Sequence, residues 1–293
     1  GKSFSLISGV DIPVLLALFA FAVQGTSDFW LKSAVVRRGD PFSVITMTSP
    51  SFFVTSALLG AILGALQFSA PTLLYGFLTG ILSFIAMNLY INSLKEGEAS
   101  VNTMLFRLSF VITSLLSIGI LRESSGWLKW LGLVFAAGAV CSVTLGGGPG
   151  GGTSRKAVSL AIAALIFYGV NSFFMKVAAL EGVTAPGLAV VASFTFGLLS
   201  VLVHFFPWGG FRFLASPAAV RYGLIAGFTQ ALAINAIVWA MGLGGEASVV
   251  IPILQLSFVW TAALAIMSLK EAINARKGLG FVLAVLAIFV LAR

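Results

Sequence analysis

The sequence predicts an all-α, polytopic membrane protein with ten transmembrane helices, arranged as two inverted five-helix repeats. Three observations lead to this fold class. Of the 293 residues, 59% are hydrophobic and only 9% are charged, whereas a soluble domain carries about 25% charged residues. The apolar residues gather into ten segments, and the two halves of the chain repeat each other. Too few polar side chains are present to cover a water-facing surface, so most of the protein is expected to lie in lipid.

The ten segments have lengths near the roughly 20 residues that a transmembrane helix needs. In the first half they cover residues 12–36, 42–66 (interrupted by Pro50), 73–91, 99–121 and 127–145. In the second half they cover residues 157–179, 185–206, 222–241, 247–269 and 278–292. A Gly- and Pro-rich run at the midpoint is expected to be a flexible linker. We therefore assign residues 1–145 to the first repeat, 146–156 to the linker and 157–293 to the second repeat.

The duplication is clearest around the fourth and ninth segments. Glu98 and Glu246 stand 148 positions apart, and the same offset relates Arg107 to Gln255. Self-similarity of this kind marks a repeat architecture. Because five spans is an odd number, the second repeat must enter the membrane upside down relative to the first. Inverted repeats are typical of secondary transporters, whose substrate site lies near the middle of the bilayer where the repeats meet.

The composition argues against several other classes of protein. The net charge is +8, but the basic residues lie mostly in short loops, as membrane insertion favours, so we expect no nucleic-acid partner. The single cysteine, Cys141, excludes an intrachain disulfide, and the single histidine, His204, has no second metal ligand near it in the sequence. No Ser/His/Asp set and no phosphate-binding glycine loop is present. We therefore predict that the protein is not an enzyme and uses no cofactor or metal ion.

In each half the fourth segment ends in an apolar-basic-Glu step, and the fifth segment contains a glycine. These residues are Leu121-Arg122-Glu123 with Gly132, and Leu269-Lys270-Glu271 with Gly280. With these features the two halves resemble the ten-span EamA-type branch of the drug/metabolite transporter superfamily. The resemblance covers residues 12–292. It implies a central cavity lined by the third, fourth, eighth and ninth segments, with the fifth and tenth outside. Similar proteins export amino acids and other metabolites, one branch exporting aromatic amino acids, and some import sugars or vitamins.

We accordingly predict a secondary transporter of small metabolites that works by alternating access around a cavity between the repeats. Export of amino acids, aromatic ones included, is the leading expectation. Import or facilitated passage of sugars, nucleosides, vitamins or organic cations is the alternative, and a membrane enzyme or lipid-handling protein is less expected. The expected partners are a small-molecule substrate and the lipid bilayer, in the inner (plasma) membrane of a prokaryote. Two complete halves in one chain predict that a monomer suffices.

Two indications of the orientation in the membrane disagree. The face opposite the two termini carries ten of the 14 basic residues assigned to loops and chain ends. The positive-inside rule then places the termini outside. Proteins of the resembling family are commonly drawn with cytoplasmic termini.

Arg107 is the most informative side chain inside an apolar segment. It lies eight residues into the fourth segment, about 12 Å along a helix, where an unpaired arginine costs at least about 2.5 kcal/mol. We expect it to face the cavity and to bind a carboxylate or another anionic group of the substrate. The alternative is a structural arginine that pairs with Glu98 or Asp28, or that extends to the membrane surface. Its repeat equivalent, Gln255, is uncharged, so the two repeats differ here.

Other polar and aromatic side chains at membrane depth are candidates for the cavity wall, because each polar group there needs a partner. Those assigned to substrate binding besides Arg107 are Asn88, Tyr90, Asn102, Gln230, Trp239 and Gln255. Asn88 repeats as Asn235, and for this pair hydrogen bonds between helices are the favoured alternative. For the two aromatic residues, which can contact an apolar side chain or an organic cation, the alternative is ordinary packing.

Two further residues are assigned to the transport cycle. Asp28 is the carboxylate best placed for a proton-linked step, and the alternative is neutralisation by Lys32, one helical turn away. Pro252 is expected to kink the ninth segment and to act as a hinge, since its repeat equivalent is Met104. Lys32 and its equivalent Lys176 lie near segment ends, where their side chains are expected to reach the membrane surface.

Acidic residues mark the ends of the fourth and ninth segments. Glu98 and Glu246 precede these segments, where a carboxylate is favoured by the helix dipole, so we expect both to cap helices. Glu123 follows the fourth segment, where the dipole is unfavourable, and we expect Arg122 to compensate its charge.

Overall fold

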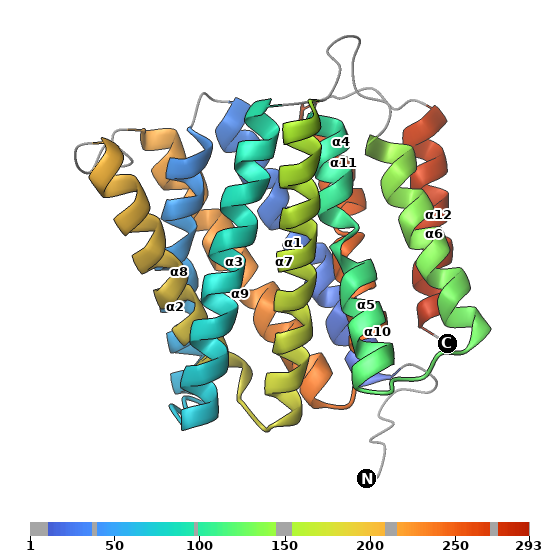
Figure 1. The fold of residues 1–293 in the computed structure, drawn as a ribbon, viewed down its shortest axis with the longest axis horizontal. Helices are drawn as coiled ribbons and strands as arrows, with labels where there is room; N and C mark the ends of the chain where they lie inside the picture. The colour runs from blue at the N-terminus through green and yellow to red at the C-terminus, as the bar shows by residue number, and fades with distance from the viewer. Residues whose placement is uncertain are drawn as a thin grey trace.

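The computed structural model describes residues 11–36, 40–96, 99–144, 154–208, 216–269 and 275–292. Every regular element in these ranges is an α-helix, as the predicted fold class requires. The helices stand side by side in one bundle (Figure 1). The predictions for Glu98 and for the step Lys270-Glu271 lie outside the described residues.

Twelve helices are described, and they reproduce the ten predicted segments. The first repeat contains α1 (Ile12–Val36), α2 (Pro41–Ile62), α3 (Ala70–Glu96), α4 (Ala99–Arg107), α5 (Ser109–Ile120) and α6 (Trp127–Thr144). The second contains α7 (Arg155–Leu180), α8 (Ala185–Trp208), α9 (Pro217–Gly242), α10 (Ala247–Gln255), α11 (Phe258–Leu269) and α12 (Ala275–Leu291). Seven stretches are long and apolar enough to cross a membrane, and three shorter apolar helices occupy the remaining places. The chain is an integral membrane protein.

The two repeats run through the bundle in opposite directions. In Figure 1, α1 rises from the lower edge to the upper edge, whereas α7, its counterpart, descends from the upper edge to the lower one. The most extensive contacts join helices of different repeats: α1 with α9, α3 with α7, α2 with α9, and α6 with α12. Because α1 corresponds to α7 and α3 to α9, the first two contacts are symmetric copies of each other. The repeats therefore interlock and do not form two separate bodies.

The fourth and ninth spans are each broken near the middle, at equivalent positions. α4 ends at Arg107 and α5 begins at Ser109, while α10 ends at Gln255 and α11 begins at Phe258. Arg107 and Gln255 are 148 positions apart, so the break is a property of the duplicated unit. Each break leaves backbone groups at mid-membrane without their usual helical partners.

A break of this kind does not require proline. Pro252 lies inside α10, three residues before the helix ends, and the fourth span breaks at the same place with Met104 at the equivalent position. Pro50, expected to interrupt the second segment, likewise lies within the continuous helix α2.

Glycine brings the broken spans close to their neighbours. A Cβ atom on Gly25 of α1 would lie 2.5 Å from the carbonyl oxygen of Ser257, and one on Gly169 of α7 would lie 2.7 Å from that of Ser109. Gly25 and Gly169 are repeat equivalents, as are Ser109 and Ser257. Only a residue without a side chain allows helices to approach this closely. The same symmetric contact therefore holds each break against the first helix of the other repeat.

Candidate functional site

A cavity of about 860 Å³, its open mouth included, lies between the first three spans of both repeats. Its wall is built by α1, α2, α3, α7, α8 and α9, and most of it is apolar. The polar part of the wall consists of Thr48, Ser49, Thr79, Ser83, Tyr168, Asn171, Ser193 and Gln230. None of the described lining residues carries a charged side chain.

This lining differs in part from the one implied by the family resemblance. α3 and α9, the third and eighth spans, do contribute to the wall, as expected. The broken fourth and ninth spans supply none of the lining residues, and their places are taken by α1, α2, α7 and α8. The expectation for the fourth and ninth spans is therefore wrong for this cavity; α1 and α7, which pack on these spans, supply lining residues instead.

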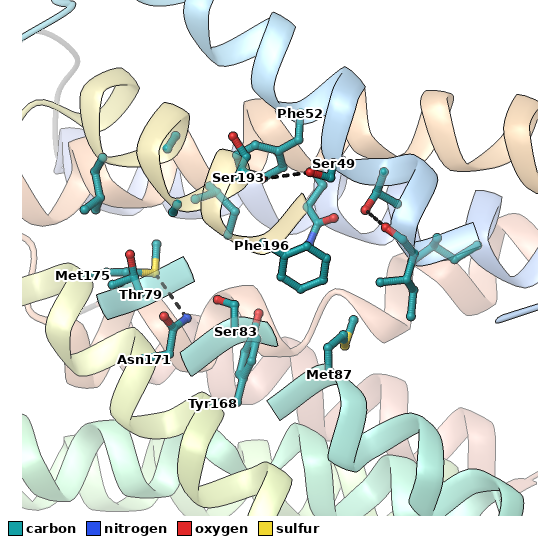
Figure 2. Close-up of a pocket in the computed structure, with 18 residues that line it drawn as sticks. Ser49, Phe52, Thr79, Ser83, Met87, Tyr168, Asn171, Met175, Ser193 and Phe196 are labelled. Carbon is teal, nitrogen blue, oxygen red and sulfur yellow. Dashed lines mark hydrogen bonds between the residues drawn. The ribbon is translucent and has the colours of Figure 1, made fainter. Parts of the chain in front are cut away.

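The cavity lies on the symmetry axis that relates the two repeats. Ser49 of α2 and Ser193 of α8 are equivalent residues, 144 positions apart, and they meet at the cavity wall. The Ser49 hydroxyl donates a hydrogen bond of 2.9 Å to the carbonyl oxygen of Ser193, as Figure 2 shows. This places the cavity where the two repeats join, as the inverted-repeat argument predicted.

Asn171 and Gln230 bring amide groups to the wall. The Asn171 Nδ2 contacts the sulfur of Met175 at 3.8 Å, and its buried Oδ1 accepts no hydrogen bond from the described residues. Figure 2 shows this amide beside Ser83 and Tyr168. A buried carbonyl oxygen without a donor is costly. Asn171 Oδ1 is therefore the wall atom that gains most from an N–H or O–H group of a ligand.

Arg107, at the break between α4 and α5, forms an ion pair with Asp28 of α1. Its Nη2 lies 2.7 Å from Asp28 Oδ2, and the two side chains are 15% and 17% exposed. Its Nη1 donates to the carbonyl oxygen of Gln255 at 3.2 Å and to the hydroxyl of Ser257 at 3.3 Å. The guanidinium also lies 5.6 Å from the centre of the Phe258 ring. Arg107 thus joins α1 to both breaks.

The second repeat makes the same contact without charges. Gln255, the equivalent of Arg107, donates from Nε2 to the Ser109 hydroxyl at 3.2 Å, just as Arg107 donates to Ser257. The equivalent of Asp28, at an offset of 144, is Ser172, which donates to a carbonyl oxygen of its own helix. The two sites therefore have one geometry, and only the first contains an ion pair.

Aromatic rings connect this ion pair to the cavity. The Phe106 ring, next to Arg107 in α4, lies 4.8 Å from that of Tyr168, which is part of the cavity wall. On its other side Phe106 stacks on Tyr90 at 4.3 Å. The Tyr90 hydroxyl is 2.8 Å from that of Thr103. A shift of α4 that moved Arg107 would therefore move an aromatic wall of the cavity.

Among the predicted binding residues, Gln230 alone lines the cavity. Asn88 donates to Phe84 within its own helix, and Asn102 donates to the carbonyl oxygen of Ser93 and so ties α4 to α3. Trp239 packs against the main hydrophobic core. Their binding roles, like those of Tyr90, Gln255 and Arg107, stay predictions. Asn235, for which a scaffold role was favoured, bonds to Ser56 of α2.

Several residues of the wall were not singled out from the sequence. Asn171 has the same sequence feature as Asn88 and Gln230, which were predicted to bind substrate: each is an amide inside an apolar segment. Thr48 and Ser49 belong to the run Thr46-Met47-Thr48-Ser49 in an otherwise apolar segment. In a membrane such a run of hydroxyl groups is itself a sign of contact with a helix or a cavity.

A polar network joins the two repeats at the edge where α5 ends and α10 begins. Glu123 accepts hydrogen bonds from the backbone N–H groups of Ala247 and Ser248, at 2.7 and 2.9 Å, and so caps α10. The charge of Glu123 was expected to be compensated by Arg122, but Glu123 instead bonds to the first N–H groups of α10. Arg122 itself has a positive φ of 56°, a strained conformation for a residue with a side chain, and it turns the chain where α5 ends.

Glu246 stands at the N-cap position of α10, as predicted, but its side chain makes no capping hydrogen bond and instead reaches the first repeat. It pairs with Lys129, and it accepts hydrogen bonds of 3.0 Å from the backbone N–H and the hydroxyl of Ser124. Burial acts to raise the pKa of Glu246, but the hydrogen bonds from Lys129 and Ser124 outweigh burial, so that this pKa lies below its ordinary value. The paired, ionised form is the stable one at neutral pH.

Lys176 was expected to reach the membrane surface and is buried instead. Its ammonium donates to the carbonyl oxygens of Met241 and Gly245, at 3.1 and 2.7 Å. These carbonyls lie at the C-terminal end of α9, where a cation is favoured by the helix dipole. Lys176 therefore holds the connection between α9 and α10 against α7.

Comparison with protein families identifies the architecture. The model of the EamA-like transporter family matches residues 11–145 and again residues 155–293. The chain belongs to the EamA-like transporter family. The two matches coincide with the two interlocked repeats, so each repeat is one copy of the family's unit. Membership makes this protein a membrane transporter of small molecules.

A solved structure described only as "Crystal structure of protein" has the same fold. Its TM-score is 0.75 at 16% sequence identity, and the match covers 95% of each chain. At this identity the likeness concerns the fold alone. No protein of curated function matches this EamA-like chain.

Proposed function

We propose that this EamA-like protein is a secondary transporter of small amphipathic metabolites without net charge, with apolar and aromatic amino acids as the first class to consider. The cavity supports this proposal, because its wall combines hydroxyl and amide groups with apolar and aromatic side chains. A solute with a net charge would lose its hydration there without meeting a counter-charge.

Within the cavity we assign the polar contacts to Asn171 and Gln230 and the apolar contacts to Tyr168 and Phe196. An amino group donates well to Asn171 Oδ1, which has no donor among the described residues. Arg107, behind the rings of Phe106 and Tyr168, is assigned to the carboxylate. It is the cation at the break of the fourth span.

The transport cycle follows from the interlocked repeats. Since each repeat packs mainly on the other, one sequence half cannot rock as a unit without separating α1 from α9 and α3 from α7. We infer that motion occurs at the breaks of the fourth and ninth spans, with Pro252 easing the bend of α10 because it lacks a backbone N–H. Both repeats line the cavity, so one chain suffices. We place it in a prokaryotic inner membrane.

A second class of substrate has support from one observation. Arg107 is already paired with Asp28, and none of the described residues of the cavity wall is a cation. The cavity as it stands therefore suits uncharged metabolites, such as sugars, nucleosides or vitamins. Amino acids require that the pair rearrange.

Exchange of labelled solutes across proteoliposomes tests the proposal. Phenylalanine, leucine, uridine and glucose are offered to the wild type, to Asn171→Ala, and to Asn92→Ala as the matched control, because Asn92 is an exposed amide of α3 that bonds to its own helix. We expect saturable exchange of one class, and a loss of affinity of about tenfold in Asn171→Ala, from the roughly 1.5 kcal/mol of a hydrogen bond. Equal affinities in wild type and Asn171→Ala contradict the assigned site.

Failure to exchange any of these solutes contradicts the proposed substrate class. The direction of transport is measured as uptake into inside-out and right-side-out vesicles. Export is the direction suggested by the resemblance, and it requires uptake into inside-out vesicles.

A further inference from the structure

We infer that a substrate carboxylate takes the place of Asp28 on Arg107 while Asp28 takes up one proton, so that solute and proton cross the membrane together in the same direction. This inference rests on the proposed function, since it needs a solute with a carboxylate. It goes further, because it names the coupling ion, its binding residue and the number of protons moved.

The pair lies within the membrane-spanning part of the bundle. Asp28 lies inside α1, eight residues before its last residue, and Arg107 lies at the mid-membrane break of the fourth span. Both side chains are largely buried, and each has further polar partners. Asp28 Oδ1 accepts from Gln24 Nε2 at 3.1 Å, and its Oδ2 also contacts the Ser257 hydroxyl at 3.4 Å. The pair is thus a built site with fixed hydrogen bonds.

The symmetry of the two repeats is broken at this pair. At the equivalent place the second repeat holds Gln255 and Ser172, and Gln255 bonds to Ser109 in the way that Arg107 bonds to Ser257. A neutral amide is therefore enough to hold two broken spans together. Structural need does not account for the charges of the first site, and buried charges in a membrane are costly. A functional role accounts for them.

Charge balance links the carboxylate to the proton. If Asp28 were protonated alone, Arg107 would stay charged with only the Gln255 carbonyl oxygen and the Ser257 hydroxyl as acceptors, which is unfavourable in a low dielectric. If a carboxylate bound alone, two anions would face one guanidinium. Both problems disappear when carboxylate and proton arrive together. Binding of each therefore strengthens binding of the other, as linkage requires.

The step can be written in full. The carboxylate of the solute forms hydrogen bonds to Arg107, Asp28 Oδ2 releases Arg107, and the Asp28 carboxylate gains one proton from the water on the open side. No covalent bond other than the new O–H changes. A zwitterionic amino acid then carries one positive charge across with it, so transport is electrogenic. A carboxylate solute without an ammonium group moves without net charge.

Few other groups can take this proton. Four helices pack on α1, and three of them, α2, α10 and α11, contain no charged residue in their described lengths. The fourth, α9, contains Arg221, which lies over the ring of Tyr222. On α1 itself Lys32 is one turn from Asp28. The neighbouring phenols are Tyr90 and Tyr168, whose rings both lie against the ring of Phe106. Asp28 is the carboxylate of the cluster.

The test measures solute and proton together in proteoliposomes that contain a pH-sensitive dye. Labelled phenylalanine is compared with phenylalaninol, which lacks the carboxylate, and with uridine. The variants are Asp28→Asn, with Glu181→Gln as a control that removes an exposed carboxylate, and Ser172→Ala as a control at the equivalent position. Exchange without a gradient reports binding and transport, and an imposed pH difference reports coupling.

In the wild type we expect one proton to enter with each phenylalanine, and each pH unit to support about a tenfold accumulation. Asp28→Asn should exchange phenylalanine but lose both proton entry and accumulation, whereas Glu181→Gln and Ser172→Ala keep them. Exchange of phenylalanine without proton movement, or with protons moving the opposite way, overturns the inference and leaves the proposed function intact. Exchange of uridine but not of phenylalanine also overturns the inference and leaves the proposed function intact.

A second measurement needs no solute, so the inference can be tested even if the proposed substrates fail. Dicyclohexylcarbodiimide modifies protonated carboxyl groups in apolar surroundings, and mass spectrometry locates the adduct. We expect little modification of Asp28 at neutral pH in the wild type and at least a fivefold increase in Arg107→Gln, where the carboxylate has lost its cation. Equal modification in both proteins shows that Arg107 does not hold the proton off Asp28, and it overturns the inference.

Coupling of this kind has a consequence for direction. Where the proton gradient points inward, solute is drawn inward with the proton. The inference therefore favours import for this chain, against the export that the resemblance suggested.

Discussion

The cap that Glu123 provides to α10 gives the most direct test of how the repeats are joined. In the structure Glu123 accepts from the N–H groups of Ala247 and Ser248, and from the Ser248 hydroxyl at 2.5 Å. The substitution Glu123→Ala removes all three bonds. A lost N-terminal cap costs about 0.5–2 kcal/mol, and hydrogen bonds to a charged group contribute about 1.5–3 kcal/mol.

We therefore expect the free energy of opening for the first turn of α10 to fall by about 2 kcal/mol, which corresponds to about 30-fold faster hydrogen exchange at Ala247 and Ser248. Hydrogen–deuterium exchange of the protein in detergent, read by mass spectrometry of peptides from this turn, measures the change. Glu181→Ala is the matched control, because Glu181 accepts from Tyr75 and does not contact α10. Unchanged exchange in Glu123→Ala would refute the argument that this carboxylate caps the helix across the repeat boundary.

Three further predictions concern stability and transport. Gly169→Val should lower the melting temperature in detergent by several degrees, because a Cβ there meets the Ser109 carbonyl oxygen at 2.7 Å and overpacking costs about 1–3 kcal/mol. Gly119→Ala, which meets no atom within 4 Å, is its control, and equal melting temperatures would contradict the close approach. The pKa of Glu246 lies below its ordinary value. Its ion pair therefore stabilises the fold at pH values above the ordinary pKa of a glutamate, and this stabilisation is lost as the pH falls through the lowered pKa. Between pH 7 and pH 3 the melting temperature should therefore fall less in Glu246→Gln than in the wild type. Parallel plots of melting temperature against pH would contradict a stabilising role for this ion pair. Finally, Gln230→Ala should weaken solute exchange several-fold with an unchanged melting temperature; if it alters stability alone, Gln230 supports the fold and not the solute.

Much of the fold was predictable from the sequence because the signals are strong in a membrane. Segment length, charge-poor runs and the loops between them predicted α1 at residues 12–36 and α6 at residues 127–144 to within a residue. The break at Arg107 was not predictable in this way, since nothing in the local sequence interrupts the helix there. The close approach of Gly169 to Ser109 beside this break exists only in the folded protein.

The site was less predictable for a related reason. Lipid is as apolar as the protein interior, so a transmembrane helix need not have one polar face that points inward. The sequence shows that Asn88 and Asn171 are amides at similar depth, but it does not show how each helix is turned about its axis. Packing turns Asn171 into the cavity wall and leaves Asn88 bonded to its own helix.

The sequence by itself therefore determined the number of spans, their approximate ends, the duplication and the inversion that five spans per repeat impose. Hydrophobicity, length and internal similarity act along the chain, so they can be read without coordinates. Only the tertiary structure decided that the repeats interlock, that Asp28 meets Arg107 and that Glu123 caps α10. The ion pair joins residues 79 positions apart, and the cap joins residues 124 positions apart. Both contacts depend on the rotation and crossing of helices, which a lipid-facing sequence leaves unspecified.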